Sequence, residues 1–114
     1  MANDLAYQGY KAKTADFTIT EAENGTTFTN RGAAGAVVAT LPAPFANGHY
    51  RFLVRAAQTF TIAAPTADTL VADNDATADN VAASRVGAMI EVVSDGTEWF
   101  AFGIASASNI TVNT

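Results

Sequence analysis

Apolar and polar residues alternate with a period of two along this sequence, and that pattern restricts the chain to strands. Residues 49–56 (HYRFLVRA) place Tyr50, Phe52 and Val54 on one side, and residues 58–64 do the same with Phe60 and Ile62. Alternate side chains of a strand point to opposite faces of a sheet. No long window repeats its apolar residues at the three-and-four spacing of an amphipathic helix. We therefore expect a chain built from strands.

Turn signals divide the sequence into short segments. The dipeptides Asn24-Gly25, Asn47-Gly48 and Asp95-Gly96 are typical of tight turns, because their residues tolerate a positive φ. The segments expected to form strands are 15–20, 26–31, 36–41, 49–56, 58–64, 68–72, 86–93, 97–105 and 110–112. Short strands at this spacing predict an all-β fold, either an antiparallel β-sandwich or a barrel-like (jelly-roll-like) arrangement.

The last predicted hairpin carries large apolar residues on both of its faces. If Asp95-Gly96 is a two-residue loop, Val92 lies opposite Trp99 on one face, and Phe100 and Phe102 lie on the other. A sandwich buries only one face of each sheet, and a large apolar patch on the other face marks an interaction site. We therefore expect Phe100 and Phe102 to contact another subunit, a larger assembly or the chain's own N-terminal arm, unless a closed barrel or a locally thick core encloses both faces.

The first residues differ in pattern from the rest of the chain. Residues 1–15 lack a strand period and are interpreted as an extended N-terminal arm, and residues 16–114 as a single β domain. A frayed terminus is the ordinary alternative. Because aromatic residues are uncommon in a purely solvated tail, the arm is expected to fasten the protein to its partner. The residues expected to make this contact are Leu5, Tyr7, Tyr10, Lys11 and Lys13.

Composition excludes several classes of protein. The chain has no cysteine and one histidine, so disulfides and thiolate metal sites are ruled out. Its formal net charge of −5 argues against nucleic acid and membrane surfaces as partners, because both require a cationic footprint. The sequence shows no secretion signal and no apolar run of membrane-spanning length, so synthesis in a cytoplasm is expected.

Two sets of acidic residues are candidates for chemistry. Oxygen-bearing side chains alternate through residues 73–79 as at the start of a calcium loop, although the glycine and the final glutamate of such a loop are missing. They are Asp73, Asp75, Thr77 and Asp79. A solvated acidic loop is the preferred alternative. Glu91 and Glu98 share one face of the last hairpin without a recognisable cleft, so they are interpreted as solvated rim charges. We expect neither an enzyme nor a cofactor.

Short motifs occur here in a recognisable order. They are Thr29 to Ala33, Leu41-Pro42, Gly48 to Phe52, Pro65 to Leu70, and Ser94 to Trp99. Over roughly residues 16–104 the chain resembles a β-rich module of tailed-bacteriophage virion proteins. Because these motifs are turn and core features, they specify a fold better than a function.

The resemblance implies a structural role in a virion. Such modules occur in capsid decoration (cement) proteins and in tail fibres, where they commonly assemble as trimers. Because this chain has no coiled coil or fibrous repeat, it is expected to be a decoration protein that binds the major capsid protein as a homo-oligomer. Its expected place is the outer capsid surface, where it would stabilise the head. The phage, and this protein with it, is expected to be made in a bacterial cytoplasm. The alternative is a receptor- or glycan-binding module of a tail fibre or tail tip, in which Trp99, Tyr50 and Phe102 would stack on sugars.

Overall fold

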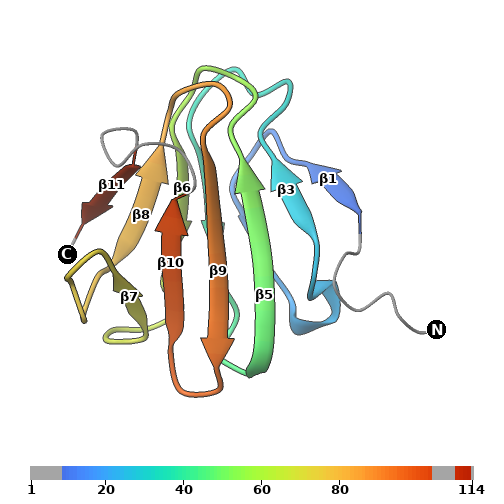
Figure 1. Cartoon of the computed structure of the whole chain (residues 1–114). Coiled ribbons are helices and arrows are strands. Elements are labelled where there is room, and N and C mark those ends of the chain that lie inside the picture. The colour runs from blue at the N-terminus through green and yellow to red at the C-terminus, as the bar shows by residue number, and fades with distance from the viewer. Residues whose placement is uncertain (1–8, 104–109, 114) are drawn as a thin grey trace.

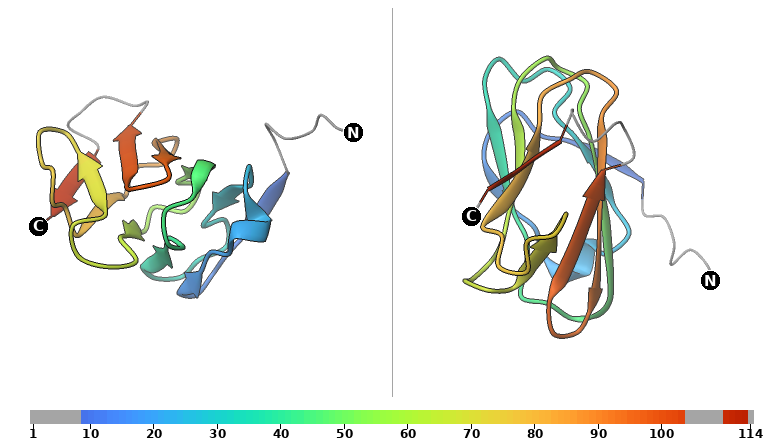
Figure 2. Two further views of the ribbon diagram at one scale, coloured as in Figure 1. Left: turned by 90° about the horizontal axis from the view of Figure 1, so that it is seen from below. Right: turned by 60° about the vertical axis from the view of Figure 1, so that its left-hand side comes forward.

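The protein folds into two β-sheets that pack face to face. The computed structural model describes residues 9–103 and 110–113. Six-stranded sheet A has the order β1 (Tyr10–Ala12), β3 (Thr27–Thr29), β5 (Ala46–Leu53), β9 (Met89–Asp95), β10 (Trp99–Gly103), β7 (Leu70–Ala72). Five-stranded sheet B has the order β11 (Ile110–Asn113), β8 (Asn80–Ala83), β6 (Phe60–Ala63), β4 (Val37–Thr40), β2 (Phe17–Thr18). Figure 1 shows the strands of sheet A side by side, and Figure 2 shows both layers. The predicted all-β, sandwich-like fold is confirmed.

The two sheets are mixed, which corrects the prediction of an antiparallel fold. The chain passes from one sheet to the other after nearly every strand, and the first three strands of each sheet run in the same direction. Strands β1, β3 and β5 are parallel neighbours in sheet A, as are β2, β4 and β6 in sheet B. Antiparallel pairs connect β9 to β5 and β10, and β8 to β6 and β11. A jelly roll, by contrast, is antiparallel throughout.

Two of the three predicted tight turns do not join paired strands. Asn24-Gly25 follows the short 3-10 turn η2 (Glu21–Glu23) and precedes β3. Asn47-Gly48 lies inside β5, at an irregularity in its pairing with β9, and Asn47 has a left-handed φ of 65°. A bulge, like a turn, requires a residue that leaves the regular strand conformation. The same dipeptide chemistry therefore indicated a turn where the strand has a bulge.

Strands β1 and β8 were not predicted. The segment Tyr10–Ala12 pairs with β3 at the edge of sheet A, within the stretch expected to be an arm without strand structure. Strand β8 lies between β6 and β11, directly after the acidic stretch 73–79, in a segment where no strand was predicted. Each is only three or four residues long, too short to display a period. Residues 1–8 of the expected arm lie outside the described residues, so the domain boundary stays a prediction.

The hairpin of β9 and β10 exists, but its connection is longer than predicted. Ser94 pairs with Trp99, so residues 95–98 form the connection. Asp95 Oδ1 accepts the N–H groups of Thr97 at 2.9 Å and Glu98 at 3.1 Å, and these hydrogen bonds hold the pKa of Asp95 below its ordinary value. Such forward bonding along the chain stabilises a wider turn. Because the pairing differs from the predicted one by an even number of residues, every side chain keeps its predicted face.

Aromatic rings fill the space between the sheets. The largest fully buried side chains are Trp99, Tyr50, Phe28, Phe52 and Phe60. The ring centroids of Tyr50 and Trp99 lie 5.7 Å apart, within the range of favourable ring contacts. Trp99 Nε1 donates to the Pro42 carbonyl at 2.8 Å, and the Tyr50 hydroxyl donates to the Thr20 carbonyl at 2.7 Å. The Trp99 face of the hairpin is therefore the core face. No helix in the described ranges has the length and apolar character needed to cross a membrane.

Candidate interaction face

The outer face of sheet A is the candidate interaction face. Strand register brings residues that are distant in the sequence into one row across this face. From β1 to β10, the row reads Tyr10, Thr27, Arg51, Glu91 and Phe102. Neighbouring strands lie about 4.8 Å apart, so the four intervals of this row span roughly 19 Å. The row ends in an aromatic ring on either side and is charged in the middle.

Apolar side chains are exposed on the β10 side of this face. Phe102 is 49% exposed and Val93 is 37% exposed, and Phe100, the cross-strand partner of Val93, is half-buried. We call these three residues the outer apolar patch. The core beneath them is already closed, because Trp99 on the opposite side of the same strand is fully buried. Exposed apolar side chains that cluster in this way mark interaction surfaces.

A compact charged cluster lies at the centre of the same face. Glu91 Oε2 contacts His49 Nε2 and accepts a hydrogen bond from Arg51 Nε at 3.0 Å. Burial alone would raise the pKa of Glu91, but the hydrogen bonds from His49 and Arg51 hold its pKa below the ordinary value. Glu91 is therefore ionised at neutral pH and already paired. A paired carboxylate with its hydrogen bonds made is less costly to cover than an isolated one.

The interpretation of Glu91 as a solvated rim charge was wrong. Its side chain is only 15% exposed, and both of its side-chain partners, His49 and Arg51, come from β5. The sequence pattern did contain a signal, since His49 and Arg51 alternate on the polar side of residues 49–56. Glu91 could not be added to them because the pairing of β5 with β9 was not predicted.

The two lysines predicted to bind a partner both make contacts within the protein. Lys11 Nζ donates to Glu23 at 2.6 Å, and Lys13 Nζ lies 5.0 Å from the ring centroid of Phe17. Of the seven residues predicted to contact a partner, the outer face of sheet A holds Tyr10, Phe100 and Phe102. Leu5 and Tyr7 lie outside the described residues. Tyr10 is 68% exposed and lies on edge strand β1, three or four strands away from the outer apolar patch on β9 and β10.

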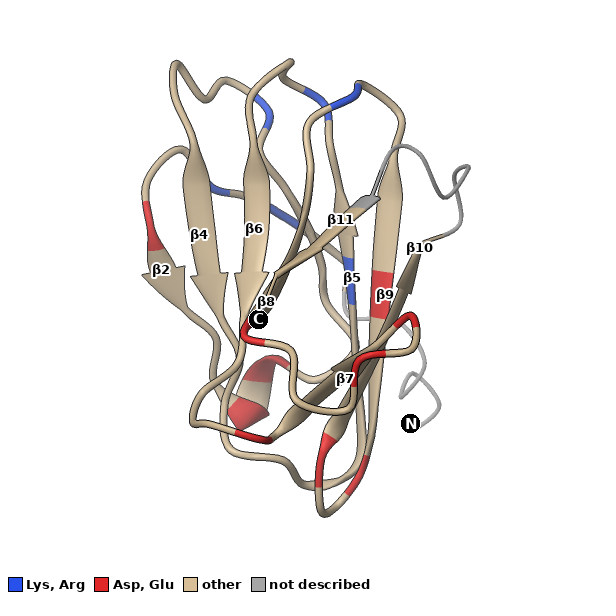
Figure 3. Ribbon diagram, turned by 90° about the vertical axis from the view of Figure 1, so that its left-hand side faces the viewer, with Lys and Arg blue, Asp and Glu red and all other residues tan. Residues whose placement is uncertain are grey.

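The charges on the loops and turns at the two ends of the sandwich are of opposite sign, as Figure 3 shows. One end of the sandwich consists of the loops 30–36, 54–59 and 84–88. These loops carry the exposed residues Arg31, Arg55 and Arg85. The turns and the 3-10 segment at the opposite end carry Glu21, Glu23, Asp68, Asp79, Asp95 and Glu98. We call these regions the arginine end and the acidic end.

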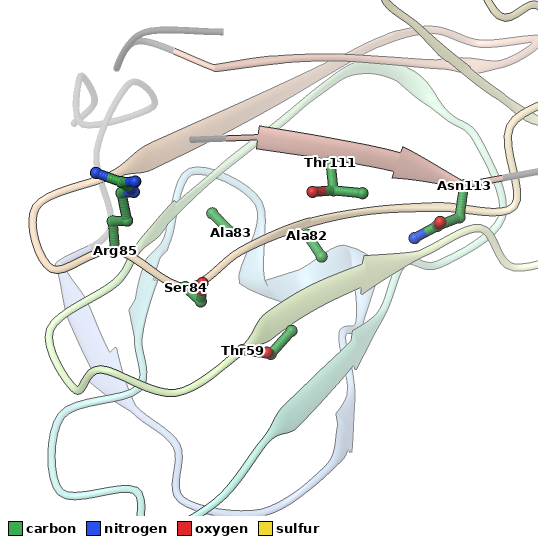
Figure 4. Close-up of a pocket in the computed structure, with 7 residues that line it drawn as sticks. All are labelled: Thr59, Ala82, Ala83, Ser84, Arg85, Thr111 and Asn113. Carbon is green, nitrogen blue, oxygen red and sulfur yellow. The ribbon is translucent and has the colours of Figure 1, made fainter. Parts of the chain in front are cut away.

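A shallow pocket of about 270 Å³ opens beside the arginine end, over strand β8 (Figure 4). Small alanine side chains leave the space, and hydroxyl, amide and guanidinium groups surround it. The lining residues are Thr59, Ala82, Ala83, Ser84, Arg85, Thr111 and Asn113. Pockets for apolar ligands are lined mainly by hydrophobic and aromatic side chains. This lining instead suits a small polar or anionic group.

The acidic stretch 73–79 forms turns. Asp75 exchanges backbone hydrogen bonds with Ala72, and Asp75 Oδ1 accepts the Thr77 N–H at 3.0 Å. Across residues 9–103 and 110–113, no group of three or more His, Cys, Asp or Glu side chains is placed to hold a metal ion.

No known protein family and no curated protein matches this chain. The outer face of sheet A, the two charged ends and the motif resemblance are therefore the basis for inferring function.

Proposed function

We propose that this protein is a non-enzymatic capsid decoration protein that binds the major capsid protein on the outside of a phage head. It acts as a homo-oligomer, with a trimer favoured by the resemblance, and it stabilises the shell by adding interface area. A specific interface of standard size buries about 1,600 Å² in total, all of which must be separated before the shell opens. The net charge of −5 suits the outer surface, because the packaged genome inside is a polyanion.

The observation that carries the proposal is the outer apolar patch. Phe102 and Val93 remain exposed on a sheet whose other face already fills the core. Folding of the single chain does not need them there, so they are available to bury area against a neighbour. The paired charges of Glu91 and Arg51 beside the patch fit an interface whose polar groups are satisfied before the partner arrives.

Burial counts against the tail-fibre alternative in the form stated above. A sugar-binding platform requires exposed rings, but Trp99 and Tyr50 are both fully buried. Of the three proposed stacking residues, only Phe102 is accessible. A glycan platform on this chain would therefore have to be built from the outer apolar patch and Tyr10 alone.

Serine substitutions in the two sheets test the proposal. Val93→Ser and Phe102→Ser remove exposed apolar surface from the outer face of sheet A. Val38→Ser is the matched control, because Val38 is a half-buried valine that follows buried Val37 on a central strand of sheet B. The readouts are the sedimentation coefficient of the free protein and its co-sedimentation with phage shells that lack it.

We expect the sheet A variants to keep the β-type circular dichroism spectrum of the parent and to lose oligomer formation, shell binding or both. The Val38→Ser variant should behave as the parent does. Oligomer formation and shell binding that both survive the sheet A changes would remove the outer apolar patch as the interface. A parent protein that stays monomeric and does not bind shells would refute the proposed function.

A further inference from the structure

The cations of this protein fall into two groups of equal size. Lys11 and Arg51 are held in ion pairs with the protein's own carboxylates, and Lys13 lies over an aromatic ring. The other three cations of the six are Arg31, Arg55 and Arg85. All three are exposed, and within the described residues none of them forms an ion pair. Their charge is available to a partner, whereas the first three charges are already used.

The arginines gather at one end because their loops follow neighbouring strands. Arg31 follows β3, Arg55 follows β5, and Arg85 precedes β9. These strands are adjacent in sheet A and lie about 4.8 Å apart. The exposed side chain of Val86, 58% accessible, stands next to Arg85 in the same loop. The arginine end therefore combines three guanidinium groups with an apolar contact.

Hydrogen bonds fix the three loops to one another. Asn30 is fully buried, and its Oδ1 accepts the N–H groups of Arg55 at 2.8 Å and Ala56 at 2.9 Å. Val54 donates its N–H to the loop 84–88 at 3.0 Å and accepts an N–H from the same loop at 2.8 Å. Because the backbone is held in place, a partner does not have to order these loops on binding, and less entropy is lost.

We propose that the arginine end binds a carboxylate-rich protein surface. Guanidinium groups match carboxylates in geometry and can donate two parallel hydrogen bonds to each. The polar pocket beside Arg85 adds the hydroxyls of Thr59, Ser84 and Thr111, which can hold one such carboxylate. The chemistry of the surface follows from these residues, and its identity as an acidic patch on the capsid shell rests on the proposed function.

A protein partner fits this end better than a nucleic acid does. Nucleic-acid sites neutralise many phosphates with a broad cationic surface, but this chain carries a net charge of −5 and three available cations. Exposed Val86 also suits a mixed protein surface more than a phosphate backbone. In a cyclic oligomer whose axis follows the strands, the arginine ends of all subunits face the same side. Several such ends acting together would bind more tightly than one.

The test compares two triple variants that have the same net charge. The end variant combines Arg31→Ser, Arg55→Ser and Arg85→Ser. The control variant combines Lys11→Ser, Lys13→Ser and Arg51→Ser. Each variant loses three positive charges, so the formal net charge changes from −5 to −8 in both. Binding to immobilised poly-L-glutamate is measured at low ionic strength and again near 0.1 M salt, where the screening length falls to about 10 Å. If the control variant unfolds, two double variants replace the triple ones. The control is then Lys11→Ser combined with Lys13→Ser, and the end variant is Arg31→Ser combined with Arg85→Ser.

The parent should bind poly-L-glutamate, and added salt should weaken this binding. The end variant should bind roughly tenfold more weakly or worse, as expected for three lost ion pairs, while the control binds as the parent does. Equal losses in both variants would overturn the proposal, because net charge alone would then explain them. Absence of binding by the parent, or tighter arginine-dependent binding to single-stranded DNA, would also overturn it.

The same variants separate this inference from the proposed function. If the end variant still co-sediments with phage shells as the parent does, the arginine end is not the docking surface, although the decoration role stands. If the parent binds poly-L-glutamate through its arginines but does not bind shells, the carboxylate-binding end stands and the decoration role fails.

Discussion

The packing around Gly48 predicts the cost of a single added methyl group. A Cβ on Gly48 would stand 2.5 Å from Cη2 and 2.9 Å from Cζ3 of Trp99, closer than real Cβ atoms approach. The indole cannot turn aside easily, because Trp99 is fully buried and its Nε1 donates to the Pro42 carbonyl at 2.8 Å. The substitution Gly48→Ala must therefore displace the central ring of the core or shift the β5 bulge.

Overpacking of this kind costs about 1–3 kcal/mol of the free energy of unfolding. In a domain of about this size, each kcal/mol corresponds to a decrease in Tm of roughly 4–8 °C. Equilibrium urea unfolding, followed by the fluorescence of the single tryptophan and by circular dichroism, measures the change. Gly35→Ala is the matched control, because a Cβ there meets nothing within 4 Å, and its stability should equal or slightly exceed that of the parent.

A second substitution identifies the cause of the loss. Trp99→Phe removes the outer part of the indole that the new Cβ would contact. Gly48→Ala should then be nearly neutral in the Trp99→Phe background, which corresponds to a coupling energy of about 1–2 kcal/mol between the two positions. If Gly48→Ala costs the same in both backgrounds, or nothing in either, the contact between β5 and Trp99 is not as described.

Three further predictions concern other parts of the fold. Asn30→Ala leaves the part-buried N–H groups of Arg55 and Ala56 without their side-chain acceptor, so thermal and urea unfolding should show a loss of about 2–4 kcal/mol. The pKa of Glu91 is lower in the folded protein than its ordinary 4.5, so ionised Glu91 stabilises the fold above pH 4.5. This stabilisation is lost as the pH falls through the folded pKa. In Glu91→Gln, the free energy of unfolding measured from pH 7 to pH 3 should therefore decrease less at acid pH than it does in the parent. Deleting residues 2–13 removes β1 from the edge of sheet A. The Tm should therefore fall, while the circular dichroism spectrum stays β-type. An unchanged Tm would show that β1 contributes nothing to stability.

Local patterns in the sequence predicted the strands that are half-buried and long enough to alternate. Residues 49–56 place Tyr50, Phe52 and Val54 in the core, as their period of two indicated. Strand β8 escaped prediction because its apolar residues are one valine and two alanines in a polar stretch. The parallel winding was also missed, because a change of sheet depends on which distant strands pair, and no local pattern encodes that.

For the candidate surfaces too, features that depend on residues near each other in the sequence were predictable, and features that depend on the pairing of distant strands were not. The exposure of Phe102 followed from the alternation within one hairpin, which is local. The pairing of Glu91 with β5 and the gathering of Arg31, Arg55 and Arg85 at one end both require the strand order of sheet A. The ion pair of Lys11 was missed for a similar reason, since its acceptor lies on η2, across an edge that was not predicted.

The most direct test of the decoration role is a cryo-electron microscopy comparison of phage particles assembled with and without this protein. The account predicts extra density on the outer surface of the head, present only when the protein is included, with the outer faces of sheet A between neighbouring copies or against the shell. Density confined to the tail, or heads that are identical in the two preparations, would contradict it.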